Sequence, residues 1–479
     1  MAEEEGITKK KSENFSEWYH EVIQKADIID QRYPLQGFLV YKGNGLAILE
    51  KAIGFLEDLL NANGYTKCYF PPLIPESLLK KEEAHIRGFQ DEVFWVTRAG
   101  QNEMGEKVAL RPTSETAMYE MLKLWIRSHR DLPTKIYQST SVWRYETKHT
   151  RPLIRDRELL WNEAHSLHAT LKDVSKHMKE MIRIYSKVYE FCAIPVVFID
   201  VKTGLFAGAV QAIEAYTIFP DGKVLEMGSI NNLGQRFSKA FDIKFVKEDG
   251  TQQYVYQGCY GISERLVAAV VAIHGDDKGL VLPPNVASVQ AVIVPIFGED
   301  DENIIKYCKA VYRKLRKKFR IKLDLSREKT PGWKFNHYEM LGIPVRIEIG
   351  KKEVESKTVT LVRRNDREEF LSHFEKLPRE LYNILKSIQT DMYKKALSEF
   401  QKRLSEAKNM DDLRKILNEK GGLVKTEWCG KQDCADNLKA ESKGGEIIGV
   451  PYGVKEKANS SCVWCNDKSR YIVYVGNTY

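Results

Sequence analysis

Residues 143–166 read WRYETKHTRPLIRDRELLWNEAHS, a pattern of strand, basic loop and second strand. We predict the two strands over 135–147 and 155–165, on either side of the polar loop KHTRPLI. Arg144 and Glu146 stand where the first strand ends. Because charged residues commonly end strands, this pair by itself leaves a functional and a purely structural interpretation open.

A second informative stretch is GISER at 261–265, which is followed by LVAAVVAI at 266–273. The latter segment is apolar on every face, which predicts a buried helix. Arg265 therefore stands at the start of that helix, where a guanidinium needs an anionic partner and where anions are favoured. A nucleotide phosphate and an internal carboxylate both meet these demands, and the sequence leaves both open.

The N-terminal half contains further regular elements. Apolar residues at steps of three and four predict an amphipathic helix over 46–60. A short strand over 66–70 follows and stops at two prolines. Helices are also predicted over 114–125 and 171–192, on either side of the two strands described above.

The Gly- and Pro-rich segment HGDDKGLVLPP predicts a domain boundary near residue 284. Residues 286–380 alternate in the order β-α-β-α-β, which predicts a small α/β domain with a mixed sheet. A charge-rich helix from Pro378 to about Lys408 leads into the C-terminal tail. We therefore expect three domains, at 1–284, 285–380 and 381–479.

Four of the eight cysteines form two close pairs in the tail, Cys429-x4-Cys434 and Cys462-x2-Cys465. Each pair supplies half of a tetrahedral site, because Zn²⁺ binds four thiolates at about 2.3 Å. Four thiolates leave no position for water, which indicates a structural metal. The alternative is four unrelated buried thiols, and the sequence leaves it open.

The composition limits the class of protein. The 479 residues include 74 Lys+Arg and 66 Asp+Glu, a formal net charge of +8, and 43% are hydrophobic. No run of about 18 apolar residues occurs, which argues against a membrane-spanning helix, and there is no GxxxxGK[ST] phosphate loop. The N-terminus is charged and lacks the apolar core of a secretory signal, so we expect a cytoplasmic protein with no membrane partner.

Together these segments resemble motifs 1, 2 and 3 of class II aminoacyl-tRNA synthetases. From about Phe15 to Tyr479 the chain resembles prolyl-tRNA synthetases of the archaeal and eukaryotic type. The resemblance implies a multidomain α/β protein with an antiparallel-sheet catalytic core, an α/β anticodon-binding domain and a small α/β zinc-binding C-terminal domain. The motifs that carry it are RPTSET (111–116), WRYETKHTRPLIR (143–155), LLWNEAHS (159–166), NNLGQRFSK (231–239), HGDDKGLVLPP (274–284) and PGWKFNHYEMLGIPVRIE (331–348).

The resemblance implies an enzyme that activates proline with ATP and Mg²⁺ and transfers it to tRNA(Pro). The implied catalytic residues are Arg144, at the α-phosphate and the reacting carboxylate, and Arg265, at the γ-phosphate. The implied ATP site comprises Arg144, Glu146, Arg155, Glu226, Ser229 and Arg265. The implied amino-acid site comprises Thr113, Glu115, Arg144, Trp161, Glu163, His165, Phe206, Asn231 and Ser263.

Some positions depart from the family pattern. Val210, Gln211 and Asn231 differ in the pocket region, and Glu226 replaces a glutamine near the nucleotide. These changes put the identity of the amino acid in doubt more than the reaction type. Two alternatives therefore stay open: a synthetase paralogue that charges another amino acid, and a non-catalytic tRNA-binding relative.

The resemblance also implies partners. Glu339 and Arg346 are expected to contact anticodon bases, and basic residues of a helix over 301–319 to contact phosphates. A homodimer is expected through the helix 46–60 and the strand 66–70, with an interface upward of about 2,000 Å². The basic residues are Arg313, Lys314, Arg316, Lys317 and Lys318.

Overall fold

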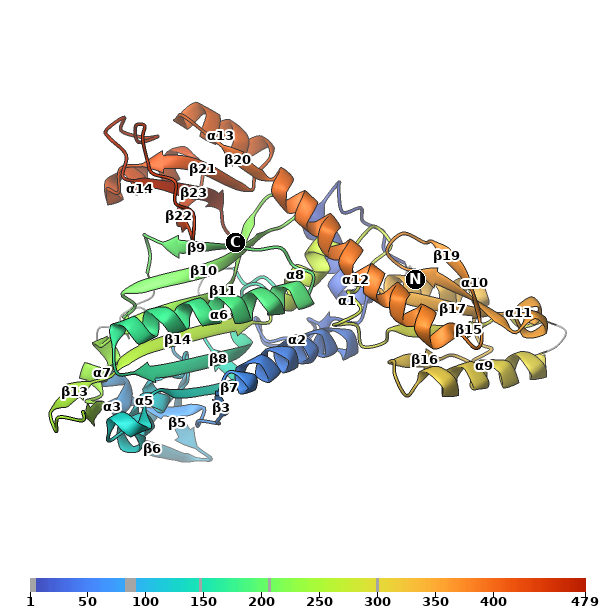
Figure 1. Ribbon diagram of the computed structural model, residues 1–479, viewed down its shortest axis with the longest axis horizontal. Coiled ribbons are helices and arrows are strands. Elements are labelled where there is room, and N and C mark those ends of the chain that lie inside the picture. Colours follow the sequence, from blue (N-terminus) through green and yellow to red (C-terminus); the bar gives the residue numbers. More distant parts are fainter. Residues whose placement is uncertain (1–5, 82–91, 146–148, 206–207, 299–300) are drawn as a thin grey trace.

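The computed structural model describes residues 6–81, 92–145, 149–205, 208–298 and 301–479 (Figure 1). Two residues of the expected site, Glu146 and Phe206, lie outside these ranges. Within them, no helix is long and apolar enough to cross a membrane.

An eleven-stranded, mostly antiparallel sheet forms the centre of the molecule, as the resemblance implies for the catalytic core. Its polar and apolar residues alternate along the strands, which gives the sheet two different faces. In spatial order the strands are β20 (Leu404–Glu406), β21 (Leu423–Trp428), β23 (Tyr471–Asn477), β22 (Gly445–Pro451), β9 (Val197–Val201), β10 (Gln211–Ile218), β11 (Val224–Gly234), β14 (Tyr256–Ser263), β8 (Glu158–His168), β7 (Thr134–Trp143) and β3 (Thr66–Lys67).

Helices cover one face of this sheet. Helix α6 (Leu171–Phe191) lies along β8, β14 and β11, and α2 (Gly43–Ala62) packs beside it (Figure 1). Helix α8 (Arg265–His274) buries all of its residues from Leu266 to Ala272, as the apolar segment predicts. The opposite face is left for polar residues, except where α5 (Glu115–Trp125) and α7 (Arg236–Ala240) pack over one end.

Smaller elements surround this core. Helix α1 (Phe15–Lys25) packs on α8. Two-stranded sheets join β1 (Ile29–Asp30) to β2 (Val40–Tyr41) and β12 (Lys244–Val246) to β13 (Gln252–Tyr254). A three-stranded sheet has the order β4 (Leu73–Pro75), β6 (Asn102–Leu110) and β5 (Trp95–Ala99), next to α3 (Glu76–Lys80).

Several predicted strand limits were wrong. The strand expected over 66–70 is only Thr66–Lys67, because Phe70 N–H bonds the side chain of Gln138 and not a neighbouring strand. The strands expected over 135–147 and 155–165 are Thr134–Trp143 and Glu158–His168. Arg144 therefore lies just beyond its strand.

The second unit is a five-stranded mixed sheet, as predicted. Strand β15 (Ala291–Pro295) runs parallel to β16 (Ile321–Leu323) and β17 (Val345–Ile349), and β18 (Thr358–Arg363) and β19 (Glu369–His373) continue antiparallel. Its helices are α9 (Asp301–Leu315), α10 (Pro331–Met340) and α11 (Lys351–Ser356). The helix predicted over 301–319 ends at Leu315, because the chain then turns to enter β16.

Helix α12 (Leu377–Lys402) connects this unit to the tail (Figure 1). The predicted boundary after residue 380 falls inside this continuous helix, and the domain boundaries stay predictions. It ends before the predicted Lys408, because Leu404 begins a strand beside Leu423. The tail adds α13 (Met410–Glu419) and α14 (Gln432–Glu441). Its strands extend the central sheet, because β22 pairs antiparallel with β9. The sequence did not predict this continuity.

Candidate functional site

The strand register brings polar residues together on the uncovered face of the central sheet. Residues paired across antiparallel strands share a face, so each row below is a set of neighbours. Gly261 has no side chain, and the nearest atom to the position that a Cβ would take there is Ser229 Oγ, at 4.0 Å. The space above Gly261, in the middle of these rows, is therefore open. The rows are His165, Cys259, Asn231 and Ala212; Glu163, Gly261, Ser229 and Glu214; and Trp161 with Ser263.

The first row is organised by hydrogen bonds to His165, which is fully buried. Its Nε2 lies 3.1 Å from Glu163 Oε1, and its Nδ1 lies 2.9 Å from the hydroxyl of Tyr119 on α5. Burial disfavours the imidazolium, but the hydrogen bond with Glu163 and the negative charges of Glu163 and Glu115 together outweigh burial and raise the pKa of His165. The ring is therefore held on both sides.

A second carboxylate lies next to this pair. Glu115 accepts hydrogen bonds from the Thr113 hydroxyl and from the Cys259 thiol, whose sulfur is 3.2 Å from Oε1. Glu115 and Glu163 are each only 1% exposed. Because buried negative charge is costly without a cation, two carboxylates in one pocket indicate a positively charged ligand.

Three buried polar atoms in the rows have no hydrogen-bond partner among the residues that the structure describes. They are Glu163 Oε2, Trp161 Nε1 and Asn231 Oδ1. Buried polar groups in folded proteins are nearly always paired, so these atoms point to a ligand with its own donors and acceptors.

Arg144 lies at one end of this pocket, beyond β7. Its guanidinium carbon is 5.5 Å from the centre of the Trp161 ring, and its Nε donates to the carbonyl of Pro112 at 2.9 Å. Burial lowers the pKa of Arg144, and Glu115 opposes this effect. The group is thus a cation that interacts electrostatically with Glu115 and Glu163 and is held by Trp161 and Pro112.

Arg265 lies at the adjacent end, at the start of α8. Its Nη1 donates to Glu226 Oε2 at 3.0 Å, and its Nε donates to the carbonyl of Ile154 at 3.1 Å. Of the two partners that the sequence left open for Arg265, this structure has the internal carboxylate. Burial and the neighbouring Glu226 raise the pKa of Glu214.

The remaining expected ATP residues lie around these arginines. Arg155 Nη2 donates to the Tyr479 carbonyl at 2.9 Å, and the Tyr479 ring lies 4.7 Å from the Arg151 guanidinium carbon. Ser229 Oγ accepts from Asn231 Nδ2 at 3.1 Å, and Ser263 Oγ lies 3.4 Å from the backbone nitrogen of Arg265. The last residue of the chain thus borders the region expected to hold the nucleotide.

The three departures from the family pattern in the pocket region are not equivalent. Asn231 is buried in the first row, opposite Cys259. Val210 is 45% exposed and precedes the strand. Gln211 pairs with Asn232, one step out of the row, so its side chain faces the other way. Of the three, Asn231 alone therefore has its side chain in the polar rows.

The four tail cysteines also come together, as their spacing predicts. Cys429 Sγ lies 3.5 Å from Cys434 Sγ and 3.8 Å from Cys465 Sγ, and one ligand atom from each of the four residues lies within 4.8 Å of the others. Sulfur atoms around a zinc ion with bonds of about 2.3 Å are roughly 3.8 Å apart. The cluster therefore has the dimensions of a metal site.

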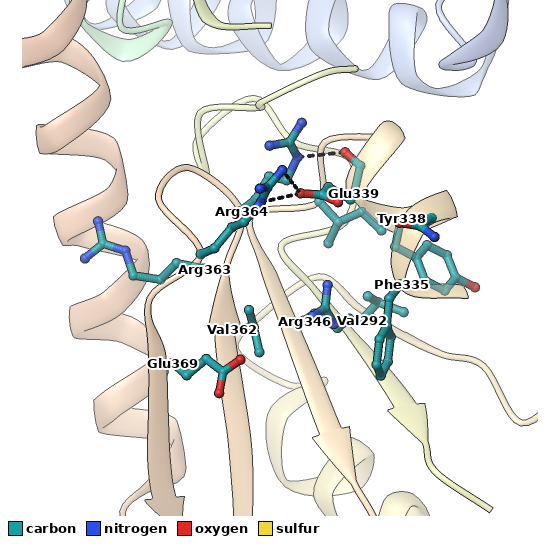
Figure 2. Close-up of a pocket in the computed structure, with 12 residues that line it drawn as sticks. Val292, Phe335, Tyr338, Glu339, Arg346, Val362, Arg363, Arg364 and Glu369 are labelled. Atoms are coloured by element: carbon teal, nitrogen blue, oxygen red, sulfur yellow. Dashed lines mark hydrogen bonds and ion pairs between the residues drawn. The ribbon is translucent and has the colours of Figure 1, made fainter. Parts of the chain in front are cut away.

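Glu339 and Arg346 line one cavity of about 240 Å³ in the five-stranded unit (Figure 2). The Arg346 guanidinium carbon lies 4.2 Å from the centre of the Phe335 ring, and Glu339 Oε1 accepts from Arg367 Nε at 2.8 Å. Arg363 also lines the cavity, but its guanidinium extends toward α12 (Figure 2) and pairs with Asp391 of that helix at 2.7 Å.

The basic residues of the predicted helix 301–319 do not line this cavity. Lys314, for example, pairs with Glu375 at 2.8 Å and lies against Phe374. The cavity takes its positive charge from the strands and their connections instead, through Arg346, Arg364 and Arg367.

The sequence analysis missed two residues of the pocket, Tyr119 and Cys259. Each carried a usable signal. Tyr119 is four residues after Glu115 and so lies on the same helix face. Cys259, Gly261 and Ser263 alternate along one strand and so share a sheet face.

Comparison with known protein families gives three matches along the chain. A family described as "tRNA synthetase class II core domain (G, H, P, S and T)" matches residues 94–274. "Anticodon binding domain" matches 290–384, and "Prolyl-tRNA synthetase, C-terminal" matches 410–479. The matched segments contain the polar rows, the cavity of Glu339 and the cysteine cluster, respectively.

Similar proteins cover the whole chain. A "Proline--tRNA ligase" from Thermofilum pendens is 44% identical over 99% of this chain and 100% of its own length. Proteins of the same name from Methanopyrus kandleri and Pyrococcus abyssi are each 42% identical, over 97% and 98% of this chain and 96% and 99% of theirs.

Proposed function

The chain belongs to the proline--tRNA ligase family, with a class II synthetase core. On the basis of this membership, we propose a role in binding or catalysis for each of its site residues. It is an enzyme that joins proline to tRNA at the expense of ATP. Full-length similarity to ligases of one name does not favour a paralogue with another substrate or a non-catalytic relative.

The amino acid binds over Gly261, between the polar rows. Its ammonium group is held by Glu115 and Glu163, with Thr113 positioning the first and His165 the second. The observation that carries this assignment is the unpartnered, buried Glu163 Oε2 beside a second buried carboxylate. The ring of Trp161 offers an apolar wall to a substrate whose side chain has no polar group.

In the first step, a carboxylate oxygen of proline attacks the α-phosphorus of ATP. The bond from this phosphorus to the bridging oxygen breaks, pyrophosphate leaves, and prolyl-adenylate forms. Arg144 stabilises the charge that accumulates at the α-phosphate. Proline enters as a carboxylate and has no proton to lose, so the step requires no general base.

Arg265 binds the γ-phosphate of ATP. Its Nη2 has no hydrogen-bond partner within the described part of the chain, while Nε and Nη1 are bound. Arg155, Ser229 and Ser263 are the further polar groups at this end. Mg²⁺, when bound, neutralises phosphate charge, and the Glu226 carboxylate is an oxygen ligand of the kind that it prefers.

In the second step, a terminal ribose hydroxyl of tRNA attacks the carbonyl carbon of the adenylate and gives up its proton to the departing phosphate. The bond from that carbon to the phosphate oxygen breaks, AMP leaves, and the ester with tRNA remains. Arg144 again faces the phosphate, whose negative charge grows as AMP departs.

The cavity of Glu339 and Arg346 binds anticodon bases of tRNA(Pro). Arg346, whose guanidinium lies over the Phe335 ring, presents hydrogen-bond donors, and Glu339 presents acceptors, so the two are suited to base edges. The basic residues 313–318 lie outside the cavity and are suited to phosphates, which position a nucleic acid without reading its sequence.

The tail cysteines hold one structural Zn²⁺. Four thiolates suit this ion, and the sulfur spacing described above fits its tetrahedral geometry. The zinc joins the turn after β21 to the segment before β23, and thereby stabilises the strands that extend the central sheet.

The enzyme is a cytoplasmic homodimer. Strand β3 lies at an edge of the central sheet, and Tyr69, two residues beyond it, is 71% exposed. An unpaired edge with an exposed aromatic residue beside it is suited to contact with a second copy.

Pyrophosphate exchange into ATP with a panel of amino acids tests the proposal. Proline is expected to drive exchange, and Glu163→Gln is expected to abolish most of it. Exchange driven by another amino acid and not by proline would contradict the assignment of the pocket.

A further inference from the structure

The amino-acid pocket contains a set of groups that an ammonium ion does not need. Glu115, Glu163, His165 and Cys259 each offer one ligand atom, and all four atoms lie within 4.8 Å of one another. We propose that this cluster is a second transition-metal site, which takes Zn²⁺ reversibly in place of the amino acid. The claim that zinc and the amino acid compete depends on the proposed function, in which Glu115 and Glu163 bind the ammonium group. The claim that the cluster binds zinc does not depend on it.

The distances suit a small tetrahedral ion. His165 Nε2 lies 3.1 Å from Glu163 Oε1, and Cys259 Sγ lies 3.2 Å from Glu115 Oε1. Ligand atoms around zinc with bonds of about 2.0–2.3 Å are roughly 3.3–3.8 Å apart. Two edges of the tetrahedron are therefore nearly formed, and the other edges need small side-chain movements.

The donor set selects the kind of metal. One thiolate, one imidazole and two carboxylates suit Zn²⁺, whereas Mg²⁺ and Ca²⁺ require oxygen ligands throughout. Burial adds to this preference, because Glu115 and Glu163 are each 1% exposed and a bound cation offsets the cost of burying their negative charge. Glu163 Oε2 has no hydrogen-bond partner in the described part of the chain, so it is available to whichever cation occupies the pocket.

The surroundings orient these ligands. A histidine that binds metal through one ring nitrogen usually keeps a proton on the other, hydrogen-bonded to a nearby group. Here Tyr119 lies 2.9 Å from Nδ1 and leaves Nε2 facing the cluster. On coordination the Cys259 thiol loses its proton to solvent, and no electron is transferred.

We expect zinc to exchange with solution at this site and not at the tail cluster. The tail offers four thiolates, whereas the pocket offers one and must open to admit substrate. Zinc in the tail therefore persists through dialysis, and zinc in the pocket exchanges with solution. Proline and zinc require the same carboxylates, so bound proline excludes the metal.

Equilibrium dialysis of the full-length protein against micromolar Zn²⁺ tests this inference. The wild-type chain is expected to bind one zinc more than Cys259→Ser, and proline is expected to displace that zinc alone. Cys308→Ser, which alters a buried cysteine of α9 outside both clusters, is the matched control and keeps the wild-type count. His165→Asn is a second variant, used if Cys259→Ser does not fold.

Inhibition of pyrophosphate exchange gives a second readout. Zinc is expected to compete with proline, and its inhibition constant should rise at least tenfold in Cys259→Ser. Equal zinc counts and inhibition constants in Cys259→Ser and wild type would overturn the metal site. A zinc that needs Cys259 but withstands saturating proline would overturn the competition. Failure of proline to drive exchange in zinc-free enzyme would contradict the proposed function, while the zinc count still decides the metal site.

Discussion

Arg364 and Asp276 form a two-pronged ion pair between the five-stranded unit and the catalytic core. Their nitrogen–oxygen distances are 2.8 and 2.7 Å, and Arg364 Nε also donates to the Glu339 carbonyl at 2.7 Å. The arginine side chain is only 3% exposed. One residue thus connects the cavity proposed for the anticodon to the segment that follows α8.

We predict that Asp276→Asn weakens this connection. The loss of a charge-assisted pair should cost about 1–3 kcal/mol of the free energy of unfolding, and aminoacylation should fall more than pyrophosphate exchange. Thermal unfolding and both rates provide the measurements. A variant in which both rates fall equally would show that the pair does not connect the two sites.

The same pair gives a pH dependence. Burial would raise the pKa of Asp276, but Arg364 outweighs burial and lowers it. A carboxyl with a lowered folded-state pKa contributes stability above its unfolded value, and that contribution is lost as the pH falls through the folded value. Between neutral pH and about pH 3, the stability of the wild type should therefore decrease more than that of Asp276→Asn, measured by urea unfolding.

Glu163→Gln should weaken proline binding selectively. The change keeps the size of the side chain and removes the charge that faces the ammonium group, so the KM for proline should rise at least tenfold, about 1.4 kcal/mol or more. The KM for ATP should stay near the wild-type value. An equal rise in both constants would indicate general disruption of the site.

Asn231→His tests how the pocket discriminates between substrates. The imidazole would extend over Ala212 and Cys259 and add a flat wall to the first row. Proline binding or its preference over alanine and cysteine should improve, by a few-fold within the ~1–3 kcal/mol that such contacts allow. Exchange rates with the three amino acids measure the change, and unchanged ratios would show that position 231 does not contact the substrate.

Glu339→Ala should slow aminoacylation of tRNA and leave pyrophosphate exchange intact, because the cavity lies outside the catalytic rows. The expected loss is about 1–3 kcal/mol of discrimination, or roughly 10- to 100-fold. Glu375→Ala is the matched control, since Glu375 is an exposed glutamate in the same unit but outside the cavity.

Removal of the proposed tail zinc should loosen the tail before it affects catalysis, because the binding energy of a structural site contributes to local folding. Hydrogen exchange should rise first in β21 and β23. Metal analysis should find zinc lost from the tail of Cys462→Ser. Full retention of that zinc would contradict the four-thiolate site.

Much of this architecture follows from the sequence alone. Apolar spacing predicts α2, α6 and the buried α8, and the alternation after residue 284 predicts the mixed sheet. Two cysteine pairs predict a metal cluster, and contiguous motifs identify the family. These features depend on residues close in the chain, where a period of 3.6 or 2 residues directly encodes which face is buried.

Other features required the tertiary structure. Alternation shows that Glu163 and His165 share a face, but not that Gly261 and Cys259 lie beside them, nearly 100 residues later in the chain. The internal partner of Arg265, the pairing of β22 with β9, and the outward positions of Val210 and Gln211 were likewise not predictable. The physical reason is that a periodic pattern specifies a face, whereas strand order and register depend on contacts between distant segments, and a one-residue shift reverses every side chain.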